Sequence, residues 1–146
     1  MAGISRSERL KKLLHLAEAK EKSSLRVLGQ VSRELLAAEL RGQELIDYRD
    51  SEQGRRLSAT RPSPAFMDAR EFFRKLTSAI SQQQAVIADL RSRRDVARAG
   101  WASARHRVSQ FERLIGRAAT DQRRHEQLIE QKDFDELTQQ RFEIRR

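Results

Sequence analysis

Residues 66–80, Phe-Met-Asp-Ala-Arg-Glu-Phe-Phe-Arg-Lys-Leu-Thr-Ser-Ala-Ile, open a stretch that continues to about Arg141 without a proline. Its apolar residues recur at alternating steps of three and four, which is typical of the buried seam of a coiled coil. The row consists of Ala69, Phe73, Leu76, Ile80, Ile87, Leu90, Ala97, Trp101, Ala104, Val108, Phe111, Ile115 and Ala118, with Gln83 and Arg94 between them. We therefore predict one helix over residues 64–141, whose apolar stripe needs a partner.

A shorter apolar row near the N-terminus predicts that partner. The pattern Ser5-x-x-Glu8 is a capping box and marks a helix start. The row that follows is Leu10, Leu14, Ala17, Glu21, Ser24, Leu28, Val31, Leu35, Ala38, Gly42 and Leu45, in which Glu21 and Ser24 weaken one turn. Gly54 is a suitable C-cap, so this helix is predicted to span residues 5–52. The small residues Ala38 and Gly42 would allow a close approach of the second helix.

The connection over residues 53–63 determines the predicted fold class. Ser63 before Pro64 resembles an N-cap followed by proline at the first helical position. Two helices joined by so short a connection fold back antiparallel. We therefore predict an all-α chain in which residues 1–146 form one antiparallel coiled-coil hairpin, with an overhanging second helix. A fold-back centred near residue 58 would place Ala38 near Ala79.

The composition limits the possible functions. Only 38% of the residues are hydrophobic and 35% are charged, which suits a thin helical core better than a thick globular one. There is no cysteine, which excludes disulfides and thiolate metal sites and is typical of cytoplasmic proteins. No apolar run approaches the roughly 20 residues of a transmembrane helix. The formal net charge of +9 favours an anionic partner, such as nucleic acid, a membrane surface or an acidic protein.

No residue pattern predicts catalysis. The histidines His15, His106 and His125 lack a second ligand at a metal-binding spacing, and no phosphate-binding glycine loop is present. Asp133, Asp135 and Glu136 form an acidic cluster, but a lone helix offers them no concave pocket. The chain is predicted to be no enzyme and to hold no cofactor or metal.

An arginine-rich segment supports one alternative function. Residues 91–117 contain eight arginines against Asp95 and Glu112, a composition that suits phosphate binding. A solvated helix face, or a docking face for an acidic protein, explains the same pattern. No zinc finger, RNP motif or aromatic–basic interleaving accompanies it. We therefore expect no nucleic-acid partner, and keep an arginine-rich nucleic-acid-binding coiled coil as the least favoured alternative.

A second apolar stripe lies beside the seam near the predicted hairpin tip. It consists of Phe72, Leu76, Ala79 and Gln83, with Leu45 and Tyr48 close to it on the first helix. Because Phe73 already serves the seam, we expect Phe72 and Ala79 to be partly exposed. The apolar face is thus wider than a two-helix seam requires, which indicates a protein-binding surface or simple packing at the edge of the seam.

In these residues the chain resembles the flagellar FliJ family of bacterial export proteins. The resemblance covers almost the whole chain and rests on the order and spacing of four pieces. They are Leu45-Ile46-Asp47-Tyr48, Phe72 with Leu76, Ala79 and Ile80, Trp101 with Arg105, and Gln131-Lys132-x-x-Asp135-Glu136. The resemblance implies a coiled-coil stalk, similar to the central subunit of rotary ATPases. Its partners would be a hexameric export ATPase, the cytoplasmic domain of the transmembrane export gate and the export chaperones, at the cytoplasmic side of the flagellar base.

The resemblance also implies which residues bind these partners. The gate-binding stripe carries over to Phe72, Leu76, Ala79, Gln83, Leu45 and Tyr48, and the ATPase contact to Gln131, Lys132, Asp135 and Glu136. The chain departs from the family pattern at Gln83, Arg41 and Glu52, where relatives have histidine, glutamine and tyrosine. These departures affect the edges of the stripe. The equivalent stalk of a virulence-type secretion system is the alternative.

Overall fold

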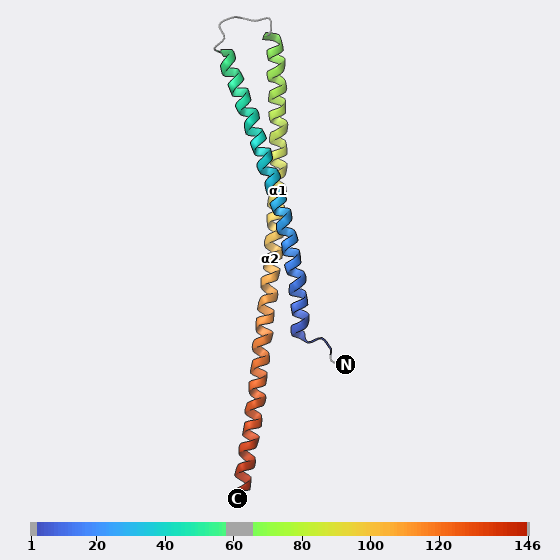
Figure 1. The fold of residues 1–146 in the computed structure, drawn as a ribbon, viewed down its shortest axis with the longest axis vertical. Coiled ribbons are helices and arrows are strands. Elements are labelled where there is room, and N and C mark those ends of the chain that lie inside the picture. Colours follow the sequence, from blue (N-terminus) through green and yellow to red (C-terminus); the bar gives the residue numbers. More distant parts are fainter. Residues whose placement is uncertain (1–2, 58–65, 146) are drawn as a thin grey trace. The chain divides into compact units, whose positions relative to one another are not determined.

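The computed structural model describes residues 3–57 and 66–145, with side chains described from Ala69 onward in the second range. It contains two helices, α1 over Arg6–Leu57 with 52 residues and α2 over Phe66–Ile144 with 79 residues (Figure 1). The two helices pack against each other as a hairpin and α2 is the longer, which confirms the predicted all-α fold class.

The predicted capping box forms the start of α1. The backbone N–H of Glu8 donates to Ser5 Oγ over 3.2 Å, and the backbone N–H of Ser5 donates to Glu8 Oε2 over 3.2 Å. The two residues thereby satisfy each other's backbone donors, which an isolated helix end leaves without partners. This prediction is confirmed.

The end of α1 lies later than the sequence predicted. The helix passes through Gly54 to Leu57, and no described glycine has a positive φ, so Gly54 does not act as a left-handed C-cap. Glu52 instead pairs with Arg55 over 3.1 Å and with Arg56 over 4.0 Å across the last turns. Cations in this position also favour the negative end of the helix dipole. The predicted cap residues Ser63 and Pro64 lie outside the described residues.

The chain divides into two compact units, of which residues 23–102 form one. Leu35, Ala38 and Leu90 are buried at its centre, and Ile87 packs against them. The predicted close approach occurs at Gly42, where an added Cβ would lie 3.0 Å from Ile87 Cδ1. The helices therefore approach closely here, and Gly42 is needed for packing rather than for its backbone conformation.

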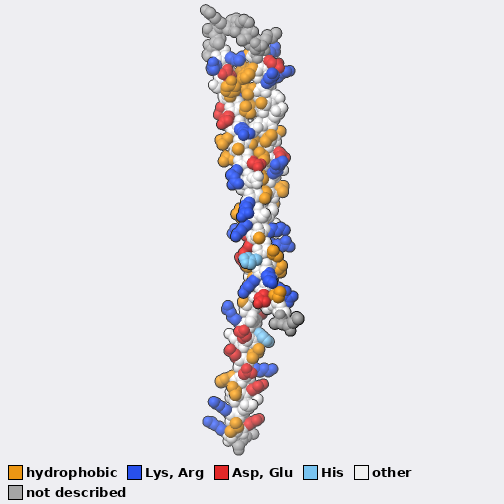
Figure 2. Space-filling model, turned by 45° about the vertical axis from the view of Figure 1, so that its right-hand side comes forward, with side chains coloured by type: hydrophobic (Ala, Val, Ile, Leu, Met, Phe, Trp, Pro, Cys, Tyr) orange, Lys and Arg blue, Asp and Glu red, His pale blue; other side chains and the backbone are white. Residues whose placement is uncertain are grey.

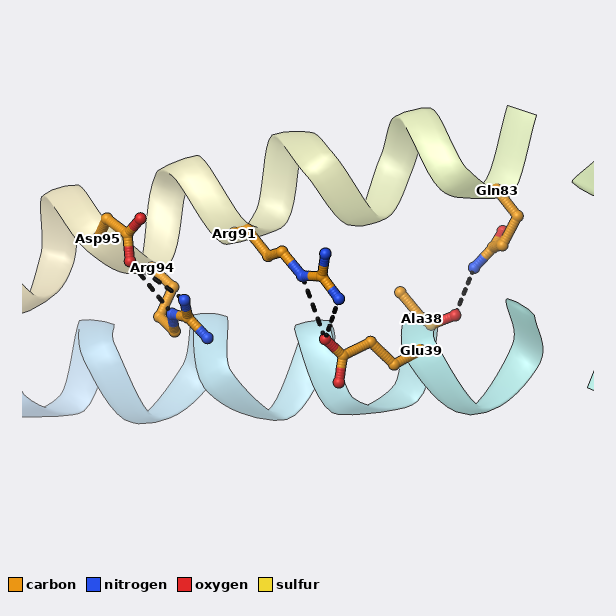
Figure 3. Close-up of polar contacts among 6 residues, drawn as sticks. All are labelled: Ala38, Glu39, Gln83, Arg91, Arg94 and Asp95. Carbon is orange, nitrogen blue, oxygen red and sulfur yellow. Dashed lines mark hydrogen bonds and ion pairs between the residues drawn. The ribbon is translucent and has the colours of Figure 1, made fainter. Parts of the chain in front are cut away.

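The pairing of the helices in this unit differs from the predicted register. The amide of Gln83 donates to the carbonyl oxygen of Ala38 over 2.9 Å (Figure 3), so the position opposite Ala38 lies about one helical turn beyond the predicted Ala79. The shift follows from the longer α1, because a helix that continues to Leu57 moves the fold-back later in the chain.

The second unit joins residues up to Lys22 with those from Ser103 onward. Ala17 of α1 and Ala104 and Val108 of α2 are buried in it, as the seam pattern predicted. The half-buried Glu21 lies 3.9 Å from Arg105, so the charged seam position has a partner on α2. Packing ends near Ala118, since every described side chain from Ala119 to Arg145 is exposed.

Candidate protein-binding surfaces

An aromatic cluster joins the end of α1 to the beginning of α2. The rings of Tyr48 and Phe72 meet edge to face at 6.1 Å, and those of Phe72 and Phe73 do so at 5.7 Å. Phe73 is half-buried in the seam, whereas 36% of Phe72 and 50% of Tyr48 remain exposed. In Figure 2, hydrophobic side chains gather at this end of the hairpin. The cluster thus has an inner ring that packs and two outer rings that face solvent.

The remaining residues of the predicted gate-binding stripe are less accessible. Leu76 is only 8% exposed and belongs to the core, while Leu45 and Ala79 are half-buried. Gln83 is half-buried too, and its amide is engaged with the Ala38 carbonyl. Phe72 and Tyr48 are therefore the exposed members of the stripe, and the other four are buried or half-buried.

Arg56 belongs to this cluster, although the sequence reasoning missed it. Its guanidinium carbon lies 4.9 Å from the centre of the Phe73 ring and 6.0 Å from that of Phe72. The spacing Glu52-x-x-x-Arg56 indicates an ion pair within one helix, because residues four apart on a helix face each other, but it does not indicate the contact with the rings. The predicted helix ended at Glu52, so Arg56 lay outside it and this ion pair was not predicted.

The last part of α2 forms a second candidate surface. Gln131, Lys132, Asp135 and Glu136, the predicted ATPase contact, are all exposed. Large apolar side chains accompany them, and Figure 2 shows these interspersed with charges of both signs. They are Leu128 at 64% exposure, Ile129 at 47%, Phe134 at 70%, Leu137 at 61%, Phe142 at 72% and Ile144 at 84%. Among the described residues, no α1 side chain covers them.

Apart from Ile129, the apolar side chains at this end do not continue the seam. Beyond Ala118, the row of the seam passes through Gln122, His125, Ile129 and Lys132. Phe134, Leu137 and Ile144 stand at steps of three and seven from one another and so share a different face of the helix. A partner helix that extended the seam would leave these side chains in solvent.

Several arginines of the segment 91–117 have acidic partners within the chain. Arg91 binds Glu39 across the two helices at 3.2 Å, and Arg94 contacts Asp95 at 3.2 Å (Figure 3). Arg93 lies 3.1 Å from Asp89, four residues earlier on the same helix. These pairs reduce the positive charge available to phosphates, and the first of them also ties α1 to α2.

The part of the chain that the structure describes contains neither a candidate metal site nor a candidate membrane span. It holds no group of three or more His, Cys, Asp or Glu side chains able to bind a metal ion. Neither described helix contains an apolar segment long enough to cross a membrane.

Comparison with known proteins points to one family. The family model for the flagellar FliJ protein matches residues 6–146, which is nearly the whole chain. No curated protein matches the sequence.

Proposed function

The chain belongs to the flagellar FliJ family, and from this premise we propose that it is a stalk linking the hexameric export ATPase to the transmembrane export gate. Family membership makes the chain a non-catalytic component of flagellar protein export. The stalk role, the individual partners and a place at the cytoplasmic side of the flagellar base are the finer parts of the proposal. The family match favours the flagellar apparatus over a virulence-type system.

One observation carries the proposal beyond the family match. Exposed apolar side chains include two groups far apart in the sequence, the Tyr48–Phe72 ring pair and the segment of α2 from Leu128 to Ile144. In soluble proteins such side chains often mark protein-binding sites when they cluster. The first group is supported by a packed hairpin, whereas the second is a helix without a described partner. Two different surfaces suit a protein that contacts two partners.

The terminal segment of α2 is proposed to contact the ATPase ring through Gln131, Lys132, Asp135 and Glu136. A helix whose side chains are exposed all round can be enclosed by a ring of subunits without unpacking the hairpin. The test is to assay the purified export ATPase, for hydrolysis rate and oligomeric state, with and without the full chain. Stimulated hydrolysis or hexamer formation is expected, and confirmed binding without either effect would contradict the stalk role.

The aromatic end of the hairpin is proposed to contact the cytoplasmic domain of the export gate. Phe72 and Tyr48 would enter the interface, while Leu76, Ala79, Leu45 and Gln83, which are buried or half-buried, would contribute less to it. Exposed aromatic side chains are frequent hot spots of protein interfaces. Titration of the isolated gate domain with the full chain measures this contact directly.

Escort of export chaperones is the third part of the proposal, and it rests on family membership alone. The test is to mix the chain with purified export chaperones, alone and in complex with their cargo, and to measure binding. Preferential binding of chaperones without cargo is expected, because an escort recycles them after release. Equal affinity for chaperones with and without cargo would contradict the escort role but not the stalk role.

A further inference from the structure

Arg56 lies where the last turn of α1 meets the aromatic cluster on α2. Its guanidinium carbon is 4.9 Å from the centre of the Phe73 ring, well within the range of a cation–π contact, and 6.0 Å from that of Phe72. Its Nε is 4.0 Å from Glu52 Oε2, at the outer limit of an ion pair. Glu52 has a closer partner in Arg55 at 3.1 Å. The Arg56 guanidinium thus contacts the aromatic rings and forms only a long ion pair with Glu52.

The exposed fraction of the side chains increases from Glu52 through Phe72 to Arg56. The Glu52 side chain is 18% exposed and that of Arg56 is 42% exposed, beside a Phe72 at 36%. Arg56 therefore covers one side of the aromatic cluster while its side chain remains partly exposed. An incoming protein that covers Phe72 would also cover this guanidinium.

Near Arg56 the charged side chains are mostly basic, whereas the acidic residues Asp47 and Asp50 flank Tyr48 in the sequence. Residues 51–57 and 69–75 contain five basic residues, Arg55, Arg56, Arg70, Arg74 and Lys75, against two acidic ones, Glu52 and Glu71. Both acidic residues are already paired inside the chain, Glu52 with Arg55 and Glu71 with Arg74 at 2.9 Å. A partner that buries this surface without carboxylates would leave the Arg56 charge desolvated, which is unfavourable.

We propose that Arg56 determines the specificity of the aromatic end of the hairpin. This inference rests on the proposed binding of the export gate and adds the chemistry of the matching surface. The gate's cytoplasmic domain supplies an apolar pocket for Phe72 with a carboxylate at its edge, and that carboxylate pairs with the Arg56 guanidinium. Arginine suits this position because one planar group can stack on a ring and still donate two parallel hydrogen bonds to a carboxylate.

The test measures the affinity of the full chain for the purified cytoplasmic domain of the export gate at several salt concentrations. Arg56→Gln removes the charge and keeps a hydrogen-bonding side chain. We expect it to weaken binding about tenfold at low salt, and the loss to shrink as salt rises from roughly 50 to 500 mM. Phe72→Ala is expected to weaken binding by a similar factor at every salt concentration, because an apolar contact is not screened.

Two control variants separate the proposed contact from other causes. Arg93→Gln removes the same charge from an exposed ion pair with Asp89, away from the aromatic residues, and is expected to leave the affinity unchanged. Arg56→Lys keeps the charge but not the planar group, and is expected to restore part of the affinity. Circular dichroism melts of all variants verify that each remains as helical as the parent chain.

The possible outcomes distinguish this inference from the function on which it depends. If Phe72→Ala weakens binding and Arg56→Gln does not, the gate contact stands and the role of Arg56 is overturned. A loss with Arg56→Gln that is the same at all salt concentrations would also overturn it, since Arg56 would then act only by packing on the rings. If the parent chain fails to bind the gate domain, the proposed function itself is overturned.

Discussion

The two parts of α2 carry similar side chains in different surroundings. Between Ala69 and Ala118, its apolar row is buried or half-buried against α1, and Ile80 is only 4% exposed. Beyond Ala118 the helix continues to Ile144, yet Leu137 is 61% exposed and Phe134 is 70% exposed. Backbone hydrogen bonding and local pairs such as Gln122 with Glu126 suffice to continue a helix that is already nucleated. Helical structure alone therefore does not show where a helix is paired.

The largest difference in stability is expected when one leucine from each part is replaced by alanine. Leu35, which is 4% exposed in the seam, loses its packing on truncation, so Leu35→Ala should lower the free energy of unfolding by about 2–4 kcal/mol. Leu137→Ala should change it by no more than about 0.5 kcal/mol. Urea denaturation followed by circular dichroism measures both. Equal losses would mean that the end of α2 is packed after all.

Adjacent phenylalanines provide the next largest contrast, at the aromatic cluster. Phe73→Ala should destabilise the hairpin by about 2 kcal/mol, because Phe73 is half-buried in the seam. Phe72→Ala should cost less than about 1 kcal/mol and chiefly weaken gate binding and flagellar assembly. Thermal melts and binding titrations of the two variants separate the effects. A reversed order of stability would show that Phe72, and not Phe73, is the seam residue.

Replacement of each of two glycines by alanine is expected to change the free energy of unfolding by amounts that differ by about 1 kcal/mol. Gly100→Ala meets no atom within 4 Å, so it should raise the stability by roughly the difference in helix propensity, about 1 kcal/mol. Gly42→Ala gains the same propensity but places a Cβ 3.0 Å from Ile87 Cδ1, so its net effect should be close to zero or negative. Denaturation midpoints compare them. A Gly42→Ala variant as stable as Gly100→Ala would indicate that the seam is less tightly packed there.

The smallest effect on stability is expected from removing residues 131–146. No described α1 side chain packs on this segment, so the unfolding midpoint of the remaining chain should change little. Binding to the ATPase ring should nevertheless weaken, because Gln131, Lys132, Asp135 and Glu136 are lost. The truncated and full chains are compared in the same ATPase assay, and unimpaired ring binding would place the contact elsewhere.

The seam was predictable because burial in a two-helix structure follows directly from a repeat of three and four. Every apolar residue assigned to the row, from Ala69 to Ala118, is buried or half-buried, and the Ser5–Glu8 capping box forms as its pattern predicts. The position of the α1 end was not predictable from Gly54 alone. The ion pairs of Glu52 with Arg55 and Arg56 accompany a helix that continues through the glycine, and the predicted register shifted with it.

The candidate surfaces were predicted in part. The exposure of Phe72 follows from its place next to a seam residue, since neighbouring residues on a helix point about 100° apart. The contact of Arg56 with two rings on the other helix depends on the rotamer of a long side chain and on the register, and neither is encoded in local spacing. The unpaired end of α2 was recognisable where the seam lost its apolar residues after Ala118.

The hydrogen bond from Gln83 to the Ala38 carbonyl has a consequence for the alignment of the two helices. A seam made only of aliphatic residues tolerates sliding by whole heptads, because each shift replaces one apolar contact by another. Here a slide would remove the half-buried amide from its acceptor, and Gly42 would no longer lie opposite Ile87, whose Cδ1 is 3.0 Å from where a Cβ would stand. The misaligned hairpin would then contain an unpaired polar group and a void. A polar residue in a mainly apolar row thus favours one axial alignment among several that the repeat alone would permit.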